Sequence, residues 1–99
     1  MKSREQIEMD FTRAVSKAQE LEEIATQLSS VANGYVEGGM SSLRSGWISE
    51  NASLFIKKGS VISKDIYDVA DDIMRIANNI RSTADIVYRA EKAATMIVY

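Results

Sequence analysis

Apolar positions recur at alternating intervals of four and three residues through the first half of the chain. The series is Ile7, Phe11, Ala14, Ala18, Leu21, Ala25, Leu28, Ala32 and Tyr35. The positions between them are mostly charged or polar, which excludes the alternation by two that a half-buried strand requires. This spacing is the heptad pattern of a helix that packs along one seam. It predicts a first helix over about residues 4–44.

The second half of the chain repeats the pattern. The series is Ala52, Phe55, Gly59, Ile62, Ile66, Val69, Ile73, Ile76, Ile80, Thr83, Val87, Ala90, Ala94 and Ile97. It predicts a second helix over about residues 50–96, with an apolar seam that only a glycine and a threonine interrupt. Because glycine inside a helix costs roughly 1 kcal/mol relative to alanine, we expect a kink at residues 58–60.

Glycines and serines gather between the two patterns, and a turn is expected there. A turn at Gly38–Gly39 would leave very unequal arms. A turn at residues 45–49 leaves two arms of about 60 Å, at ~1.5 Å per residue, which can pair along their full length. The second placement is therefore favoured. Gly46 then suits the left-handed position after a helix, Ser49 suits the N-cap of the next, and Gly38–Gly39 becomes a weak point inside the first helix.

Further apolar residues lie off the two seams. They are Val15, Ile24, Val31, Met40, Ile56, Ala70 and Ala77. This width exceeds what two helices can bury against each other, and an exposed apolar strip usually marks an interaction surface. The sequence therefore predicts an all-α fold, a single antiparallel two-helix hairpin over residues 1–99. We expect the seven residues to form its interface with a second hairpin, of the same or a related chain, in a four-helix bundle.

The composition excludes most kinds of catalytic site. Histidine and cysteine are absent, which excludes thiol chemistry, Ser-His triads and Cys/His metal sites. Four aspartates gather on the second helix, at Asp65, Asp68, Asp71 and Asp72, without the spacing of a calcium loop. They are best interpreted as a solvated face. No enzyme, cofactor or metal site is expected.

Charge and hydropathy limit which partners the chain can bind and how it could leave the cell. Twelve basic and fourteen acidic residues give a net charge of −2. Neither half, divided at Trp47, has a basic excess, so nucleic acid is disfavoured as a partner, and a membrane-surface role is disfavoured for the same reason. No apolar run approaches the ~20 residues that span a bilayer. The charged start of the chain lacks the apolar run of a general secretory signal, so any export is expected to use another route.

The residues around the expected turn form a compact motif. It consists of Leu43, Gly46, Trp47, Ser49, Ala52 and Phe55. This motif resembles the turn of the WXG100 (ESAT-6-like) family, whose members tend to read Leu-x-x-x-Trp-x-Gly, followed by small residues and an aromatic. Ser49 stands where the family has glycine. That departure suggests a divergent branch, such as the small helical partners that accompany LXG-type toxins.

The resemblance implies export by a type VII (ESX/Ess) secretion system. Members of the family are helical hairpins that dimerise antiparallel, leave the cell folded, and are recognised by a membrane ATPase through the Trp turn. We therefore expect a secreted protein with a cytoplasmic pool before export, whose partners are a second hairpin, the ATPase and an LXG-type toxin. Two alternatives stay open at this point. One is a cytoplasmic chaperone or targeting factor for a larger LXG-type toxin, and the other is a generic coiled-coil adaptor.

The resemblance also implies a Tyr-x-x-x-Asp/Glu export signal. Tyr67 and Asp71 have the required spacing and share one face of a helix, but they lie in its middle. Tyr88 and Glu91 are nearer the end of the helix, with the acid three residues after the tyrosine. Both pairs are candidates, and the signal can equally lie on the partner chain.

Overall fold

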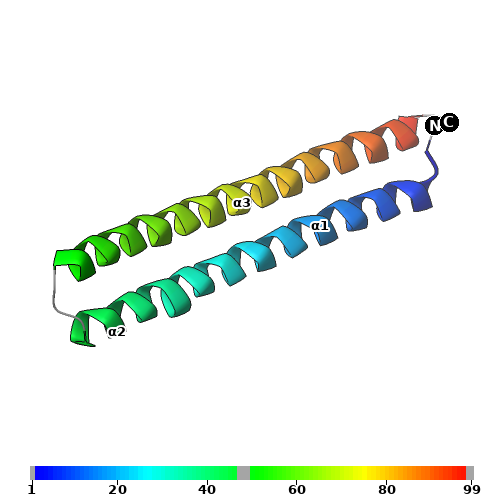
Figure 1. Cartoon of the computed structure of the whole chain (residues 1–99). Helices are drawn as coiled ribbons and strands as arrows, with labels where there is room; N and C mark the ends of the chain where they lie inside the picture. Colours follow the sequence, from blue (N-terminus) through cyan, green and yellow to red (C-terminus); the bar gives the residue numbers. More distant parts are fainter. Residues whose placement is uncertain (1, 47–49, 98–99) are drawn as a thin grey trace. The chain divides into compact units, whose positions relative to one another are not determined.

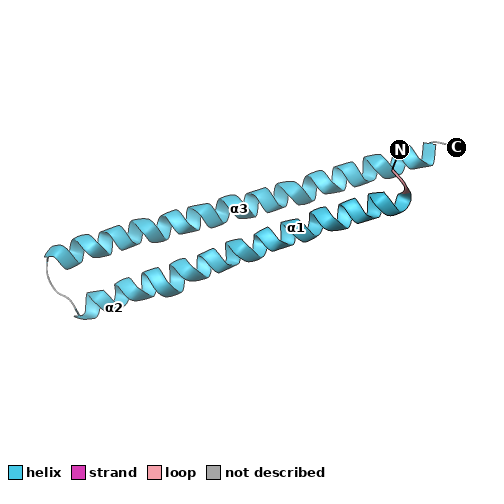
Figure 2. Ribbon diagram, turned by 45° about the vertical axis from the view of Figure 1, so that its right-hand side comes forward, coloured by secondary structure: helices cyan, strands magenta, loops and turns pink. Residues whose placement is uncertain are grey.

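The computed structural model describes residues 2–46 and 50–97, which form a helical hairpin. The first arm comprises α1 (Arg4–Val31), the π-helical segment η1 (Ala32–Glu37) and α2 (Gly38–Gly46). The second arm is the single helix α3 (Glu50–Ile97) (Figure 1). The described residues contain no strand (Figure 2). The predicted all-α hairpin is confirmed, with helix limits close to the expected ones.

Contacts divide the chain into two compact units. The first unit comprises Met1–Glu22 and Met74–Tyr99, and the second comprises Glu23–Ile73. The helices α1 and α3 pass through both units. In each unit, a stretch of the first arm packs against a stretch of α3, and each unit is described below by itself.

The start of α1 is fixed by a serine cap. The Ser3 hydroxyl accepts a hydrogen bond from the Gln6 backbone N–H at 3.1 Å, and the Ser3 carbonyl accepts one from the Ile7 N–H at 3.0 Å. The first amides of a helix have no partner within it, so a serine at this position stabilises the first turn by about 1 kcal/mol. Helix α1 therefore begins at Arg4.

The predicted seam of the first helix is confirmed as far as Ala32. Its buried members are Ile7, Ala18, Ala25 and Ala32, and its half-buried members are Phe11, Ala14, Leu21 and Leu28. The prediction is wrong at Tyr35, which is 82% exposed. Segment η1 explains the change, because a π-helix places more residues in each turn than an α-helix. The half-buried positions that follow Ala32 are Val36 within η1 and Met40 and Leu43 on α2.

Helix α3 buries a different stripe from the predicted one. One of the two predicted columns is confirmed between Ala52 and Ile80, where its members are buried or half-buried. The other column is shifted by one residue. It consists of Ile56, Ser63, Ala70, Ala77 and Ala84, which are buried or half-buried, whereas Phe55, Ile62, Val69 and Ile76 are exposed. The small residues of this column match the alanines of α1, so the hairpin closes on small side chains and leaves larger ones outside.

Two glycines differ from their predicted roles. Gly59 lies in the unbroken helix α3, and a Cβ built there would come within 2.6 Å of Met40 Cγ. It therefore provides space for Met40 where a kink was expected. Gly46 is the last residue of α2, and no described glycine has a positive φ. The left-handed position expected for Gly46 is therefore wrong. The irregular stretch near Gly38–Gly39 is η1, which ends directly before Gly38.

Candidate functional site

The two flanks of the hairpin can be assigned from the inner columns of small residues. Within the second unit these residues are Ala25 and Ala32 on the first arm and Ser63 and Ala70 on α3. Because the arms run in opposite directions, the residues that directly precede these positions on both arms line one flank. Those that follow them by four line the other flank.

The first flank of the second unit is apolar. It carries Ile24 and Val31 from α1 and Ile62 and Val69 from α3, and we call these four residues the apolar flank. Ile62 is 52% exposed and Val69 is 50% exposed, and the two from α1 are also exposed. The residues of each pair are seven apart, which brings them to the same side of their helix. This repeat is the pattern of a surface that receives another helix.

Five of the seven residues predicted to form the interface with a second hairpin are buried or half-buried within this hairpin. Ala70 is 3% exposed and Ala77 is fully buried, so both belong to the inside of the hairpin. Ile56 belongs to the same inner column and is half-buried, Met40 packs at Gly59, and Val15 is half-buried. Of the seven residues, only Ile24 and Val31 are exposed. The error follows from the one-residue shift in α3, since Ile62 and Val69 had been assigned to the seam.

In the first unit, the flank that follows the inner column by four residues is polar. Arg81 follows the buried Ala77 by four residues and donates to Glu22 Oε1 through Nε at 2.8 Å. Its Nη2 bonds to the same oxygen. Tyr88 lies seven residues further along α3, and its hydroxyl donates to Glu8 Oε1 at 2.7 Å. In the first unit this flank is therefore committed to contacts within the chain.

A group of charged and aromatic side chains joins the two arms near the start of α1. Lys2 Nζ lies 2.8 Å from Asp10 Oδ2 and 3.0 Å from Glu91 Oε1. Tyr88 stacks on Phe11 with ring centroids 4.4 Å apart. Lys92 Nζ lies 4.8 Å above the Tyr88 ring and 3.2 Å from Glu8 Oε1. We call these residues (Lys2, Glu8, Asp10, Phe11, Tyr88, Glu91 and Lys92) the N-terminal clasp.

The clasp shifts the ionisation of its own members. Hydrogen bonds from Tyr88 and then Lys92 lower the pKa of Glu8. The hydrogen bond with Lys2 lowers the pKa of Asp10. The same pairing with Asp10 raises the pKa of Lys2, and contacts with Tyr88 and then Glu8 raise the pKa of Lys92. Each of these shifts favours the charged form, so the clasp is most stable when Glu8, Asp10, Lys2 and Lys92 are all ionised.

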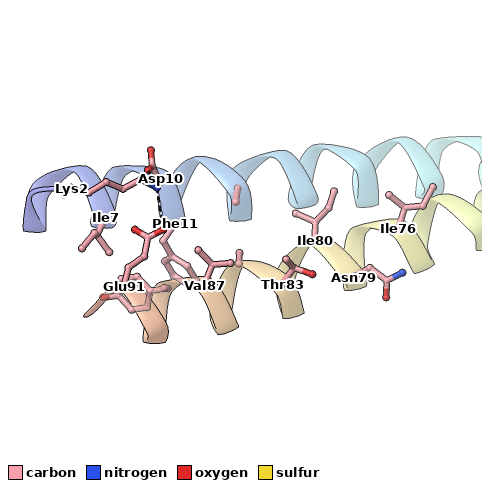
Figure 3. A pocket seen from close by; sticks show the side chains of 13 residues that line it. Lys2, Ile7, Asp10, Phe11, Ile76, Asn79, Ile80, Thr83, Val87 and Glu91 are labelled. Carbon is pink, nitrogen blue, oxygen red and sulfur yellow. Dashed lines mark hydrogen bonds and ion pairs between the residues drawn. The ribbon is translucent and has the colours of Figure 1, made fainter. Parts of the chain in front are cut away.

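A groove of about 460 Å³ lies beside the clasp in the first unit (Figure 3). Its lining is mainly apolar, and it includes Ile7 and Phe11 from α1 and Ile80 and Val87 from α3. Its charged lining residues are Lys2, Asp10 and Glu91, and Lys2 pairs with both carboxylates. These features suit apolar side chains better than a polar cofactor.

The two candidate export signals differ in their surroundings. Tyr67 is half-buried and its hydroxyl donates to Glu37 Oε2 at 3.5 Å, while Asp71 is exposed. Partial burial, followed by the nearby Glu37 charge, raises the pKa of Tyr67. Tyr88 and Glu91 are both engaged in the clasp. Only the first pair therefore offers a carboxylate on the open surface.

The turn motif is described in part. Leu43 is half-buried on α2, and Gly46 is the last residue of that helix. Ala52 is buried. Phe55 is exposed, and it also takes part in an interaction with another residue. Trp47 and Ser49 lie outside the described residues, and the capping role predicted for Ser49 stays a prediction.

No group of three or more carboxylates among residues 2–46 and 50–97 is placed to hold a metal ion. Within the same residues, no helix has the length and hydropathy needed to cross a bilayer.

In comparisons with protein-family models, curated proteins and solved structures, none matches this chain. The resemblance to the WXG100 family therefore rests on the residues around the turn and on the hairpin architecture.

Proposed function

We propose that this chain acts by helical-bundle association in a type VII secretion system, as a secreted WXG100-like protein or as an export partner. The observation that carries the proposal is the apolar flank, with Ile62 and Val69 each about half exposed. A hairpin that buries alanines and exposes isoleucine and valine at heptad spacing is suited to a partner. Its role is then contact between proteins, without catalysis.

The partner is a second helical hairpin, from the same or a related chain, that covers the apolar flank. Fully burying an aliphatic side chain contributes about 1.5–3 kcal/mol relative to leaving it exposed. The four side chains of the apolar flank are already about half covered in the hairpin, so each contributes roughly half of that, and together they offset part of the entropy lost on association. The groove beside the clasp offers further apolar surface to the same kind of partner.

The secretion role adds a recognition step to this association. The assembled bundle presents the turn around Trp47 to the membrane ATPase. Of the two candidate signals, we propose Tyr67 and Asp71, because Tyr88 and Glu91 already serve the clasp. Asp71 is exposed, and a carboxylate must be exposed if another protein is to recognise it.

The solution mass of the purified chain tests the association. We expect a dimer by light scattering after size exclusion, or a heterodimer when the chain is co-expressed with a related hairpin. Ile62→Asp with Val69→Asp should abolish the complex while the helical circular dichroism signal persists. Ile86→Asp, at an exposed isoleucine away from the apolar flank, is the matched control. An unchanged mass in the double variant would show that the flank is not the interface.

Export is tested separately, in cells that carry a type VII system. Trp47→Ala should leave association intact and reduce the amount of protein in the secreted fraction. Asp71→Asn should reduce export in the same way, whereas Glu91→Gln should not. Protein that stays in the cell fraction in every case would contradict the secretion role and favour a cytoplasmic targeting factor.

A further inference from the structure

Charge is distributed unevenly along the chain, although the total is close to neutral. Residues 38–64 contain four basic and one acidic residue, a net charge of +3. The remaining residues contain eight basic and thirteen acidic residues, a net charge of −5. The basic stretch belongs entirely to the second unit. A division of the chain at Trp47 hides this contrast, because it cuts through the basic stretch.

Three lysines of this stretch surround exposed aliphatic side chains on α3. Leu54 and Val61 are 58% and 59% exposed. Both lie two residues from buried positions, Ala52 for the first and Gly59 and Ser63 for the second. At 3.6 residues per turn, two residues correspond to about half a turn, so the two side chains point away from the first arm.

The lysines lie on the same outer side of the helix. Lys57, Lys58 and Lys64 are all exposed. Lys64 pairs with Asp68 at 3.0 Å, whereas the part of the chain that the structure describes gives Lys57 and Lys58 no ion pair. In the first unit, Lys2, Lys17, Arg81, Arg89 and Lys92 sit in ion pairs, whereas Arg4 and Arg13 have no ion pair among the described residues. Two lysines are thus available beside an aliphatic surface that the hairpin does not cover.

We propose that Leu54, Lys57, Lys58, Val61 and Lys64, which we call the basic patch, bind the surface of an anionic lipid membrane. Aliphatic side chains that protrude from a helix enter the boundary between headgroups and acyl chains. Lysine stems pack along that boundary while their ammonium groups reach the phosphates. The acidic remainder of the chain is repelled by the same surface, so the basic patch meets the membrane first.

This surface is distinct from the apolar flank. The apolar flank directly precedes the inner column, at Ile62 and Val69, whereas Leu54 and Val61 lie on the side of α3 opposite the hairpin contact. An acidic segment of another protein would also satisfy the lysines. The protruding aliphatic residues favour a lipid surface, because it accepts them without a matching set of pockets. The proposal does not depend on the secretion role.

Co-sedimentation of the full chain with lipid vesicles tests the basic patch. We expect binding to vesicles of phosphatidylcholine mixed with phosphatidylglycerol, no binding to phosphatidylcholine alone, and weaker binding as salt is raised. Lys57→Gln with Lys58→Gln should lower the partition coefficient by about 25-fold, at roughly fivefold for each lysine near the surface. Leu54→Ser with Val61→Ser should lower it as well, at unchanged charge.

The matched control removes two positive charges from the other unit. Arg13→Gln with Lys17→Gln changes the net charge equally and should leave binding nearly unchanged. Equal binding to neutral and anionic vesicles by the unaltered chain would overturn the proposal, and so would equal losses in the two charge variants. Binding to a polyglutamate peptide without binding to vesicles would overturn it too, and would assign the patch to an acidic protein.

Discussion

At the scale of single residues, small side chains decide which stripe the hairpin buries. Ala25 and Ala32 on the first arm leave little space for a large residue opposite them, and α3 presents Ser63 and Ala70 there. Helix axes approach to about 8–10 Å, and the lower end of that range requires small residues at the contact. The larger aliphatic residues, such as Val69, are therefore displaced to the flank.

The contact between Gly59 and Met40 leads to the first prediction. Glycine to alanine in an open helix stabilises it by about 0.5–1 kcal/mol. At Gly59 we expect the opposite, a loss of about 1–3 kcal/mol, because a new methyl group would overlap Met40. Gly39→Ala is the matched control, since nothing lies within 4 Å of a Cβ built there. Chemical denaturation should show the two variants moving in opposite directions; a stabilised Gly59→Ala would contradict the contact.

A second prediction concerns Ser63, whose hydroxyl is buried and has no hydrogen-bond partner among the described residues. Its removal relieves an unsatisfied polar group, and alanine is also the better helix former. We expect Ser63→Ala to raise the free energy of unfolding by about 1–2 kcal/mol in urea titrations. Ser60→Ala, at an exposed neighbour, should gain only about 0.5 kcal/mol from helix propensity. Equal gains in both variants would argue against burial of the hydroxyl.

At the scale of helices, the sequence predicts the elements better than their faces. The heptad spacing locates both arms, and the seam of the first arm is correct from Ile7 to Ala32. Spacing alone cannot distinguish two adjacent columns in α3. The column that contains Ile62 and the column that contains Ser63 both carry mostly apolar residues at intervals of seven. The alanines of α1 carry the missing information, because they favour small partners across the contact. Segment η1 has no marker of this kind in the sequence, and it moves Tyr35 out of the seam.

The N-terminal clasp could not be predicted from a sequence motif either, because its contacts are not local. Its charged members are far apart in the sequence, as Lys2 and Glu91 are, and they meet only once the hairpin has formed. The stack of Phe11 on Tyr88 is equally non-local. In the sequence alone, Tyr88 and Glu91 are indistinguishable from a recognition signal.

The clasp predicts how stability depends on pH. The pKa values of Glu8 and Asp10 are lowered in the folded chain. Their contribution is therefore fully present above the unfolded values of about 4, and it is lost as the pH falls through the lower folded values. The pKa values of Lys2 and Lys92 are raised. Their contribution is present below about 10.4 and is lost as the pH rises through the folded values.

Thermal unfolding followed by circular dichroism checks the acid side of this prediction. The midpoint should fall between pH 7 and pH 3 in the unaltered chain, and it should fall less in Glu8→Gln, which starts from a lower midpoint at pH 7. Glu23→Gln, at an exposed position of the other unit, serves as the control and should behave like the unaltered chain. Equal acid sensitivity in Glu8→Gln would show that its carboxylate does not support the clasp.

At the scale of the whole molecule, the hairpin is incomplete as a fold and is well suited to association. Most of its fully buried residues are alanines, and larger seam residues such as Leu21 and Ile66 are only half-buried, which limits the apolar area that a single chain buries. The same sequence places large aliphatic residues on the apolar flank and in the basic patch. The stability of the chain is therefore expected to depend on what covers these surfaces.

This dependence gives the last prediction. If a second copy covers the apolar flank, folding is coupled to association, and the thermal midpoint should rise with protein concentration by mass action. In Ile62→Asp with Val69→Asp the midpoint should be lower and independent of concentration, whereas Ile86→Asp should retain the dependence. Scanning calorimetry over a hundredfold range of concentration would measure both. A concentration-independent midpoint in the unaltered chain would exclude a self-associating flank, and adding a related hairpin would then raise the midpoint only if that chain is the partner.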